Sequence, residues 1–196
     1  INPNHHDLYD EAVRGLALAS CCEPYPTAFA LAPERDMGQY GHRVWRASER
    51  GLPSNVVQTV LQTSDGYLWL GTESGLVRFD GVAFVTFDTD NTEQLEHNTI
   101  QCLFEDSDGN LWIGTWGGGL TRYRAGTFVT YTTASGLAND FIRDVAEDSE
   151  GSIWIGTFGG GVSRLQNGEF TNFTTEEGLS SNEVRTLFAD RWGDLW

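Results

Sequence analysis

Three sets of residues in this sequence could do chemistry: an acidic turn, two glycine runs and a recurring arginine. Residues 106–110 read Asp-Ser-Asp-Gly-Asn, which resembles the start of a calcium-binding loop. Such a loop needs an acidic ligand at its twelfth position, and residue 117 is glycine. The corresponding turns at 63–66, 148–151 and 190–193 do not keep the oxygen ligands either. A hairpin turn is therefore the better interpretation, and we expect no metal.

The glycine runs 117–119 and 159–161 resemble phosphate-binding loops only in composition. A phosphate loop continues with Lys-Ser or Lys-Thr and opens a helix, and neither feature follows here. Glycine in such a position more often allows a close approach of two backbones. We therefore expect neither a nucleotide nor another cofactor.

The arginine recurs at one position of each repeat, as Arg78, Arg122 and Arg164. Two interpretations stay open: pairing with nearby carboxylates, or a ring of cations that faces an anionic or sugar ligand. The four histidines show no ligand spacing, and no nucleophile–base arrangement or carboxylate pair can be assigned. We expect no catalytic residue in this segment.

These features recur because the chain itself repeats. Tryptophans at 69, 112, 154 and 196 are separated by 43, 42 and 42 residues, and each follows a similar turn. A fixed period near 42, full of short β-type runs, predicts a β-propeller with one blade per repeat. We expect those tryptophans to pack between blades.

Four strands can be drawn in each period. In the second repeat they are 100–104, 111–115, 120–123 and 128–132, with alternating apolar and polar residues. The pairs Asp80-Gly81, Asp108-Gly109 and Asn167-Gly168 suit tight hairpins, which need positive φ.

The predicted fold is thus an all-β propeller fragment of three four-stranded blades and the start of a fourth. Repeats span about 51–92, 93–135, 136–177 and 178–196, the last one incomplete, within a propeller region from 39 to 196. The stretch from 42 matches the last strand of later blades, so we expect an outer strand that closes a ring. Because such rings hold four to eight blades, we expect this chain to be part of a longer protein.

Residues 1–38 lie outside the repeat. They carry two export-like features, a Leu-Ala-Ser-Cys box ending at Cys21 and an Ala-Phe-Ala site ending at Ala30. A signal or lipoprotein remnant and an unstructured leader are both open interpretations. Cys102 lies inside a predicted strand, and we expect a buried thiol there.

Composition limits the partners. The net charge of −16 argues against nucleic acid, because a nucleic-acid binder needs clustered Lys and Arg. No run of about 20 apolar residues is present, so no membrane span is expected in this segment.

Connectivity predicts a binding face. In an antiparallel meander alternate links share one end, so the longer links after the second and fourth strands lie together. Variable side chains on a rigid scaffold commonly form binding sites. The candidates at this end, to which the three arginines are added, are Glu73, Trp116, Phe158, Asn55, Asn139, Asp140 and Asn182.

The repeated unit resembles the two-component regulator propeller repeat: Gly-Leu-x-x-Asn-x-Val, an acidic turn ending in Asp-Gly-Asn, then Leu-Trp-Ile-Gly-Thr-x-Gly-Gly-Leu. The resemblance covers roughly residues 39–196. It implies the extracytoplasmic, periplasmic sensor portion of a bacterial receptor, similar to hybrid histidine kinases or diguanylate cyclases. One departure is the first repeat, which has Glu73-Ser74-Gly75 in place of Gly-Gly.

From this resemblance we expect a non-catalytic, ligand-sensing propeller with a small molecule or glycan as ligand. Its partner would be a downstream signalling module of the same polypeptide, and a homodimer stays open. The alternatives are a propeller enzyme, of the lyase or quinone-dependent dehydrogenase type, and a protein-interaction platform.

Overall fold

The computed structural model describes residues 44–47, 51–190 and 192–196. The leader expected at 1–38 lies outside these residues. Twelve strands and one short 3-10 turn, η2 (Thr133–Ser135), make up the regular structure of the described part. In chain order the strands are β1 (Val57–Gln62), β2 (Leu68–Thr72), β3 (Gly75–Phe79), β4 (Phe84–Phe87), β5 (Ile100–Glu105), β6 (Leu111–Thr115), β7 (Leu120–Arg124), β8 (Thr127–Tyr131), β9 (Ile142–Glu147), β10 (Ile153–Thr157), β11 (Val162–Gln166) and β12 (Glu169–Phe173).

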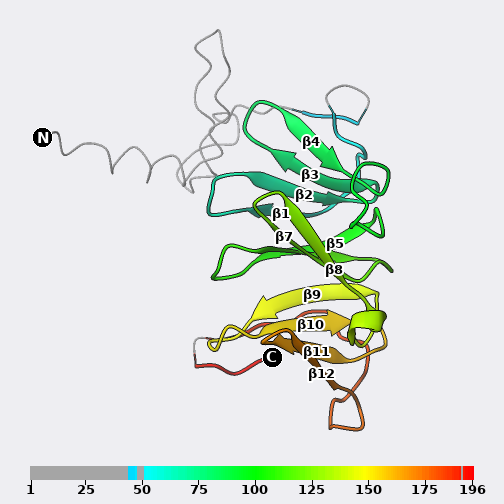
Figure 1. The fold of residues 1–196 in the computed structure, drawn as a ribbon, viewed down its shortest axis with the longest axis vertical. Coiled ribbons are helices and arrows are strands. Elements are labelled where there is room, and N and C mark those ends of the chain that lie inside the picture. Colours follow the sequence, from blue (N-terminus) through cyan, green and yellow to red (C-terminus); the bar gives the residue numbers. More distant parts are fainter. Residues whose placement is uncertain (1–43, 48–50, 191) are drawn as a thin grey trace, which may run out of the picture.

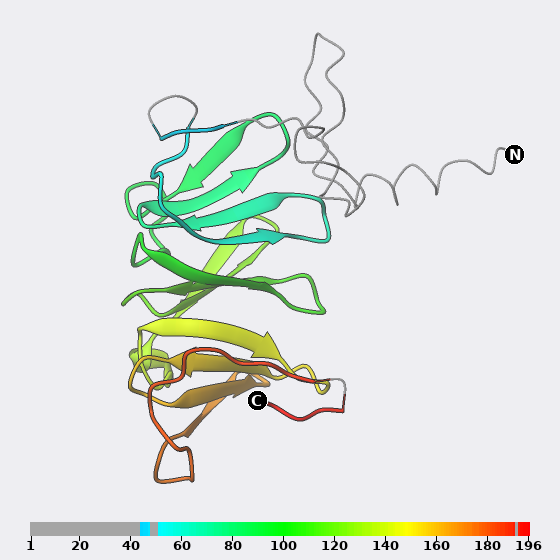
Figure 2. The ribbon, with the colours of Figure 1, turned by 180° about the vertical axis from the view of Figure 1, so that it is seen from behind.

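The strands form three separate four-stranded antiparallel sheets, each an up-and-down meander (Figures 1 and 2). Their orders are β1-β2-β3-β4, β5-β6-β7-β8 and β9-β10-β11-β12, so every sheet is one sequence repeat. The strands expected in the second repeat are confirmed, with ends that shift by one residue at most. The predicted all-β propeller with one blade per repeat is therefore confirmed.

Turn chemistry explains why each repeat folds back on itself. Gly81, Gly109 and Gly168 have φ values of 96°, 76° and 84°. Asn167 also has positive φ, at 53°, as two-residue hairpins of the primed type require. Ala125 has φ of 47° at the equivalent turn of the second blade, although alanine rarely adopts this conformation.

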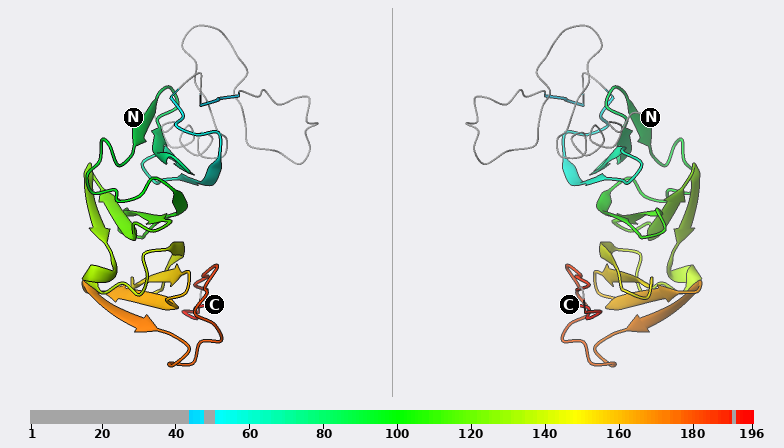
Figure 3. Two further views of the ribbon diagram at one scale, coloured as in Figure 1. Left: turned by 90° about the vertical axis from the view of Figure 1, so that its right-hand side faces the viewer. Right: turned by 90° about the vertical axis from the view of Figure 1, so that its left-hand side faces the viewer.

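The three sheets follow one another along an arc (Figure 3). The first strands of adjacent blades contact each other on the concave side, β1 with β5 and β5 with β9. The fourth strands lie on the convex side (Figure 3). The fourth repeat contributes single bridges in its described residues, Phe158 with Glu183 and Ala189 with Leu195. It therefore begins a further blade.

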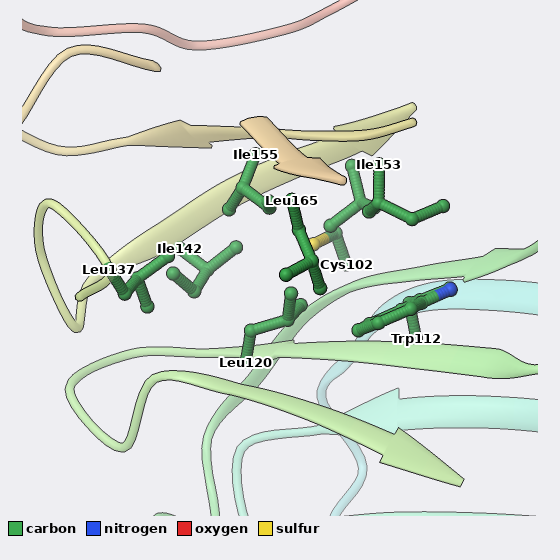
Figure 4. Packing of buried hydrophobic residues seen from close by; sticks show 9 residues of the cluster. Cys102, Trp112, Leu120, Leu137, Ile142, Ile153, Ile155 and Leu165 are labelled. Carbon is green, nitrogen blue, oxygen red and sulfur yellow. The ribbon is translucent and has the colours of Figure 1, made fainter. Parts of the chain in front are cut away.

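Apolar side chains fill the space between blades. Between the first and second blades the core includes Trp69, Leu76 and Ile100. The cluster between the second and third blades is shown in Figure 4 and comprises Cys102, Trp112, Leu120, Leu137, Ile142, Val145, Ile153, Ile155 and Leu165. Burial, helped by the charge of Asp144, raises the pKa of the Cys102 thiol to about 12. The buried thiol expected there is confirmed.

The glycine of the repeated Trp-x-Gly-Thr unit sets how closely blades approach. At Gly114 a Cβ atom would meet Cys102 Sγ and would lie 2.7 Å from Ile142 Cγ2 on the next blade. A Cβ atom at Gly71 would likewise lie 2.7 Å from Ile100 Cγ2 on the next blade. The first residue of each new blade thus packs where the preceding blade has no side chain.

A hydrogen bond ties Trp112 and Trp154 each to the turn before it. The Nε1–H of Trp112 donates to Asp106 Oδ2 at 2.7 Å, and that of Trp154 donates to Asp148 Oδ2 at 2.7 Å. Asp106 Oδ1 also accepts from the backbone N–H of Asn110 at 2.7 Å. The acidic turn is therefore a structural clip, which agrees with the hairpin interpretation of residues 106–110.

In the corresponding turn of the third blade, the folded state favours the charged form of Asp148. Burial opposes ionisation of Asp148, but hydrogen bonds from the indole of Trp154 and from the backbone of Ser152 and Glu150 outweigh it. The pKa of the Asp148 carboxyl therefore lies below its ordinary value of 3.8.

The outer strand expected from residue 42 is only partly borne out. The described residues 44–47 carry no strand assignment. Trp45 nevertheless packs on Phe84 with ring centroids 5.8 Å apart, as Phe87 packs on Phe128 at 5.3 Å. Trp45 thus occupies the position that the last aromatic residue of a preceding blade would have, although residues 44–47 do not form a strand.

Among the described residues, no helix has the length and apolar character needed to cross a membrane.

Candidate functional site

The link after the second strand of a blade is held in one shape. Thr115 Oγ1 donates to the carbonyl of Gly119 at 2.9 Å and accepts from the N–H of Gly118 at 2.9 Å. Gly117 and Gly119 have φ of 115° and 76°, values that other residues rarely adopt. Thr157 makes the same two bonds in the third blade. Trp116 and Phe158 therefore project from rigid links.

Each link is also pinned to the next blade. The N–H groups of Gly117 and Gly119 donate to the carbonyl of Asp140, at 3.1 and 3.0 Å. Gly159 and Gly161 bond the carbonyl of Asn182 in the same way, at 3.0 and 2.9 Å. These bonds place the residue after the second strand of one blade beside the start of the following blade.

Trp116 consequently meets two phenylalanines of the third blade. Its ring lies 5.1 Å from that of Phe141 at 77° and 5.5 Å from that of Phe158 at 48°. Phe141 and Phe158 are 38% and 39% exposed, which is high for side chains of this size. The two aromatic residues predicted from the sequence, Trp116 and Phe158, are thus brought together.

An arginine completes this group. The guanidinium carbon of Arg143, on β9, lies 4.5 Å from the centroid of Trp116 and 5.0 Å from that of Phe158. A guanidinium over aromatic faces is a favourable cation–π arrangement. We call Trp116, Phe141, Arg143 and Phe158 the junction cluster, because the four residues join the second and third blades.

Sequence reasoning missed Phe141 and Arg143. Both immediately flank Ile142, and at the same two places the neighbouring copies have Thr99 and Gln101, or Glu183 and Arg185. Comparing copies at these two positions, as was done for the Thr-x-Gly-Gly link, would have singled them out.

The predicted Asn and Asp residues have structural partners in the loops between blades. Each of four copies has a side-chain oxygen that accepts a backbone N–H from the end of the preceding blade. The bonds run from Ala47, Thr89, Thr133 and Thr175 to Asn55, Asn98, Asp140 and Asn182, at 2.9, 2.9, 2.7 and 2.8 Å. Asn139 Oδ1 accepts from the N–H of Phe141 at 2.9 Å. These side chains shape the loop that carries Phe141, and their direct role in binding stays a prediction.

Glu73 lies one junction earlier, on the shorter link of the first blade. It is exposed, and its carbonyl accepts from Thr99 Oγ1 at 3.3 Å. Its neighbours at this junction are therefore polar rather than aromatic.

The three arginines do not join the cluster. Arg78, Arg122 and Arg164 pair across the sheet with Trp69, Trp112 and Trp154, close to the hairpin end of each blade. The guanidinium of Arg78 lies 4.5 Å from the ring of Tyr67, and that of Arg164 lies 5.6 Å from the ring of Trp154. Arg78 also donates to the hydroxyl of Tyr123 at 3.5 Å, so these contacts lie at the opposite end of the blades from Trp116.

The fold and the repeated unit define a segment of a β-propeller. Residues 51–74, 94–117 and 136–159 match the two component regulator propeller family, so these three repeats belong to that family. Each match covers the loop into a blade, its first two strands and the start of the Thr-x-Gly link.

Solved structures show the same fold. The extracellular domain of BT4673 from B. thetaiotaomicron, described both as a one-component and as a hybrid two-component system, is 24% identical with a TM-score of 0.62. The match covers 72% of this chain and 22% of that one, so the chain spans about a fifth of its length.

Virginiamycin B lyase from Staphylococcus aureus is 17% identical, with a TM-score of 0.56 over 74% of this chain and 50% of the lyase. PorZ, a surface component of the type-IX secretion system of Porphyromonas gingivalis, is 20% identical, with a TM-score of 0.56 over 75% of this chain and 23% of PorZ. Among curated proteins, no sequence matches the chain.

Proposed function

We propose that this chain is the ligand-sensing propeller portion of a bacterial two-component-type receptor, located outside the cytoplasm and not itself catalytic. The family of its repeats supports the receptor context. The observation that carries the binding site is the junction cluster, in which exposed aromatic rings and a guanidinium meet on rigid links.

The position of the cluster suits a sensor. Trp116 belongs to the second blade, whereas Phe141, Arg143 and Phe158 belong to the third. A ligand that contacts all four would favour one arrangement of the two blades over another. A bound ligand shifts such an equilibrium by its difference in affinity for the two arrangements. A downstream module in the same polypeptide would read that shift.

A propeller enzyme is the competing class of function, since the fold is shared with virginiamycin B lyase. At 17% identity this likeness concerns the fold alone. An enzyme would convert the probe in the experiment below rather than bind it unchanged.

The test is a binding experiment on two phenylalanine variants. Galactose, galacturonate and glucosamine would be screened by thermal shift, because a ligand that binds only the folded state raises Tm. For any probe that binds, we expect Phe158→Ala to raise Kd about 10-fold, since aromatic residues dominate binding energy. Phe188→Ala serves as the control, because Phe188 is a 65% exposed phenylalanine outside the cluster.

Equal affinity of wild type and Phe158→Ala for a bound probe would remove this face from the proposal. Unchanged probe recovered by mass spectrometry would argue for a sensor, and a converted probe would argue for an enzyme.

A further inference from the structure

Arg143 is the one charged residue in the junction cluster, and its situation is unusual. The side chain is half-buried, with its guanidinium over Trp116 at 4.5 Å and over Phe158 at 5.0 Å. Its Nε is buried and has no hydrogen-bond partner among the described residues. Arginine in such surroundings normally pairs with a carboxylate, because its planar fork matches one in two parallel hydrogen bonds.

The acidic residues nearest in the chain are committed elsewhere. Asp144 Oδ2 accepts from Thr186 Oγ1 at 2.8 Å and from the N–H of Leu187 at 2.9 Å. Both oxygens of Asp140 accept from Thr133, at 2.7 and 3.1 Å. Glu183 is exposed and forms a backbone bridge with Phe158. It is the acidic group that would compete with an anionic ligand at this place.

The neighbouring junction shows that the fold does not need the cluster. Where the second junction has Trp116, Phe141 and Arg143, the first has Glu73, Thr99 and Gln101. The strand pairings β1–β2, β5–β6 and β9–β10 are nevertheless the same, each with a register shift between the first and third residues of the blade's first strand. The aromatic rings and the arginine are therefore additions to a common scaffold.

Exposed rings beside a cation favour a particular ligand chemistry. Flat apolar surfaces attract the face of a ring, and the guanidinium attracts an anion placed at the edge of that ring. We propose that the junction cluster binds a small organic carboxylate that carries a ring, with Arg143 as the partner of the carboxylate. This inference rests on the proposed function and names the class of ligand for the same site.

The net charge of the chain does not favour an anionic ligand. The net charge of −16 repels anions from the surface as a whole. Binding of a carboxylate would therefore report a local site rather than nonspecific attraction.

Four probes test the ring and the carboxylate separately, and they distinguish a sugar acid from an aromatic acid. Galacturonate is a sugar acid and galactose its neutral counterpart, while benzoate is an aromatic acid and acetate a carboxylate without a ring. Each would be titrated into the ¹⁵N-labelled chain, with the Arg143 Nε–H signal, assigned from its loss in Arg143→Gln, as the readout.

We expect galacturonate or benzoate to shift that signal and to bind at least about 10-fold more tightly than galactose or acetate. Tighter binding of galacturonate identifies a sugar acid, and tighter binding of benzoate identifies an aromatic acid. In Arg143→Gln, which places at this position the residue that the second blade has as Gln101, the preference for the acid should disappear. Arg164→Gln is the matched control, because Arg164 also lies over a tryptophan with an unpaired Nε, at the far end of the blade.

The proposal is overturned if galactose binds as tightly as galacturonate and Arg143→Gln changes neither affinity. The proposed sensor function would survive that result. Equal binding of acetate and benzoate overturns the role of the ring. If none of the probes binds up to about 20 mM, a ring carboxylate is not the ligand. The binding face in the proposed function fails separately, when Phe158→Ala leaves the affinity for a bound probe unchanged.

Discussion

Gly114→Ala is expected to lower the free energy of unfolding by about 3 kcal/mol, because the new methyl group has no space between the blades. It would meet Cys102 Sγ on its own blade and Ile142 Cγ2, 2.7 Å away on the next. Both neighbours are buried in the apolar cluster, so neither can turn into solvent. Urea denaturation followed by tryptophan fluorescence would measure the change.

Gly109→Ala separates crowding from backbone strain. Gly109 has φ of 76° with nothing within 4 Å of an added Cβ, so only the left-handed conformation is penalised, at about 1 kcal/mol. If Gly114→Ala cost no more than Gly109→Ala, close approach of the blades at Gly114 would not determine their packing.

Asp106→Ala is expected to lower the free energy of unfolding by about 3–4 kcal/mol, because it removes the clip of the second blade. Trp112 Nε1–H would lose its acceptor in a site where Trp112 is 3% exposed. The N–H and the side-chain amide of Asn110 would lose theirs as well, both at 2.7 Å. Thermal or urea unfolding would measure the loss.

The first blade supplies the control for this variant. There Thr63 Oγ1 accepts from Trp69 Nε1 at 3.2 Å and donates to Asp65 Oδ1 at 2.6 Å. Asp106→Thr would reproduce this arrangement, since Asp108 stands where the first blade has Asp65. We expect it to retain a substantial part of the stability that Asp106→Ala loses. Equal losses in the two variants would show that the indole hydrogen bond is unimportant.

The sequence was sufficient for the fold because the same local signals recur in every copy. Turn residues, strand alternation and the spacing of Trp69, Trp112 and Trp154 all indicate one blade per period. The contacts between blades were harder to predict, because they join residues 25 (Trp116 and Phe141) to 42 (Trp116 and Phe158) positions apart. Their geometry depends on how the sheets stack.

The candidate site shows where this limit lies. Connectivity alone placed Trp116 and Phe158 at one end of the blades, and the structure brings their rings to 5.5 Å. Arg143 was missed because a strand's alternation tells which side a residue faces but not which aromatic residues of another blade it meets.

The arginines of the third strand lie at the opposite end of the blades from the predicted binding face, for a reason visible in the sequence. Arg78 follows the Glu73 link by five residues, which carries it along most of a strand toward the hairpin turn.

The residue that recurs in every Gly-Leu-x-x-Asn loop, as Asn55 and Asn182 do, bonds the same backbone group in each copy. Such regular recurrence indicates a structural role, whereas the residues that differ between copies form the junction cluster.

A ¹⁹F spectrum of the chain labelled with 5-fluorotryptophan tests the junction cluster most directly. The chain has 7 tryptophans, and the signal of Trp116 would be assigned from its loss in Trp116→Phe. On titration with galacturonate or benzoate we expect the Trp116 signal to move, while those of the buried Trp69 and Trp112 stay in place. A Trp116 signal that stays fixed under a saturating probe would contradict binding at this junction.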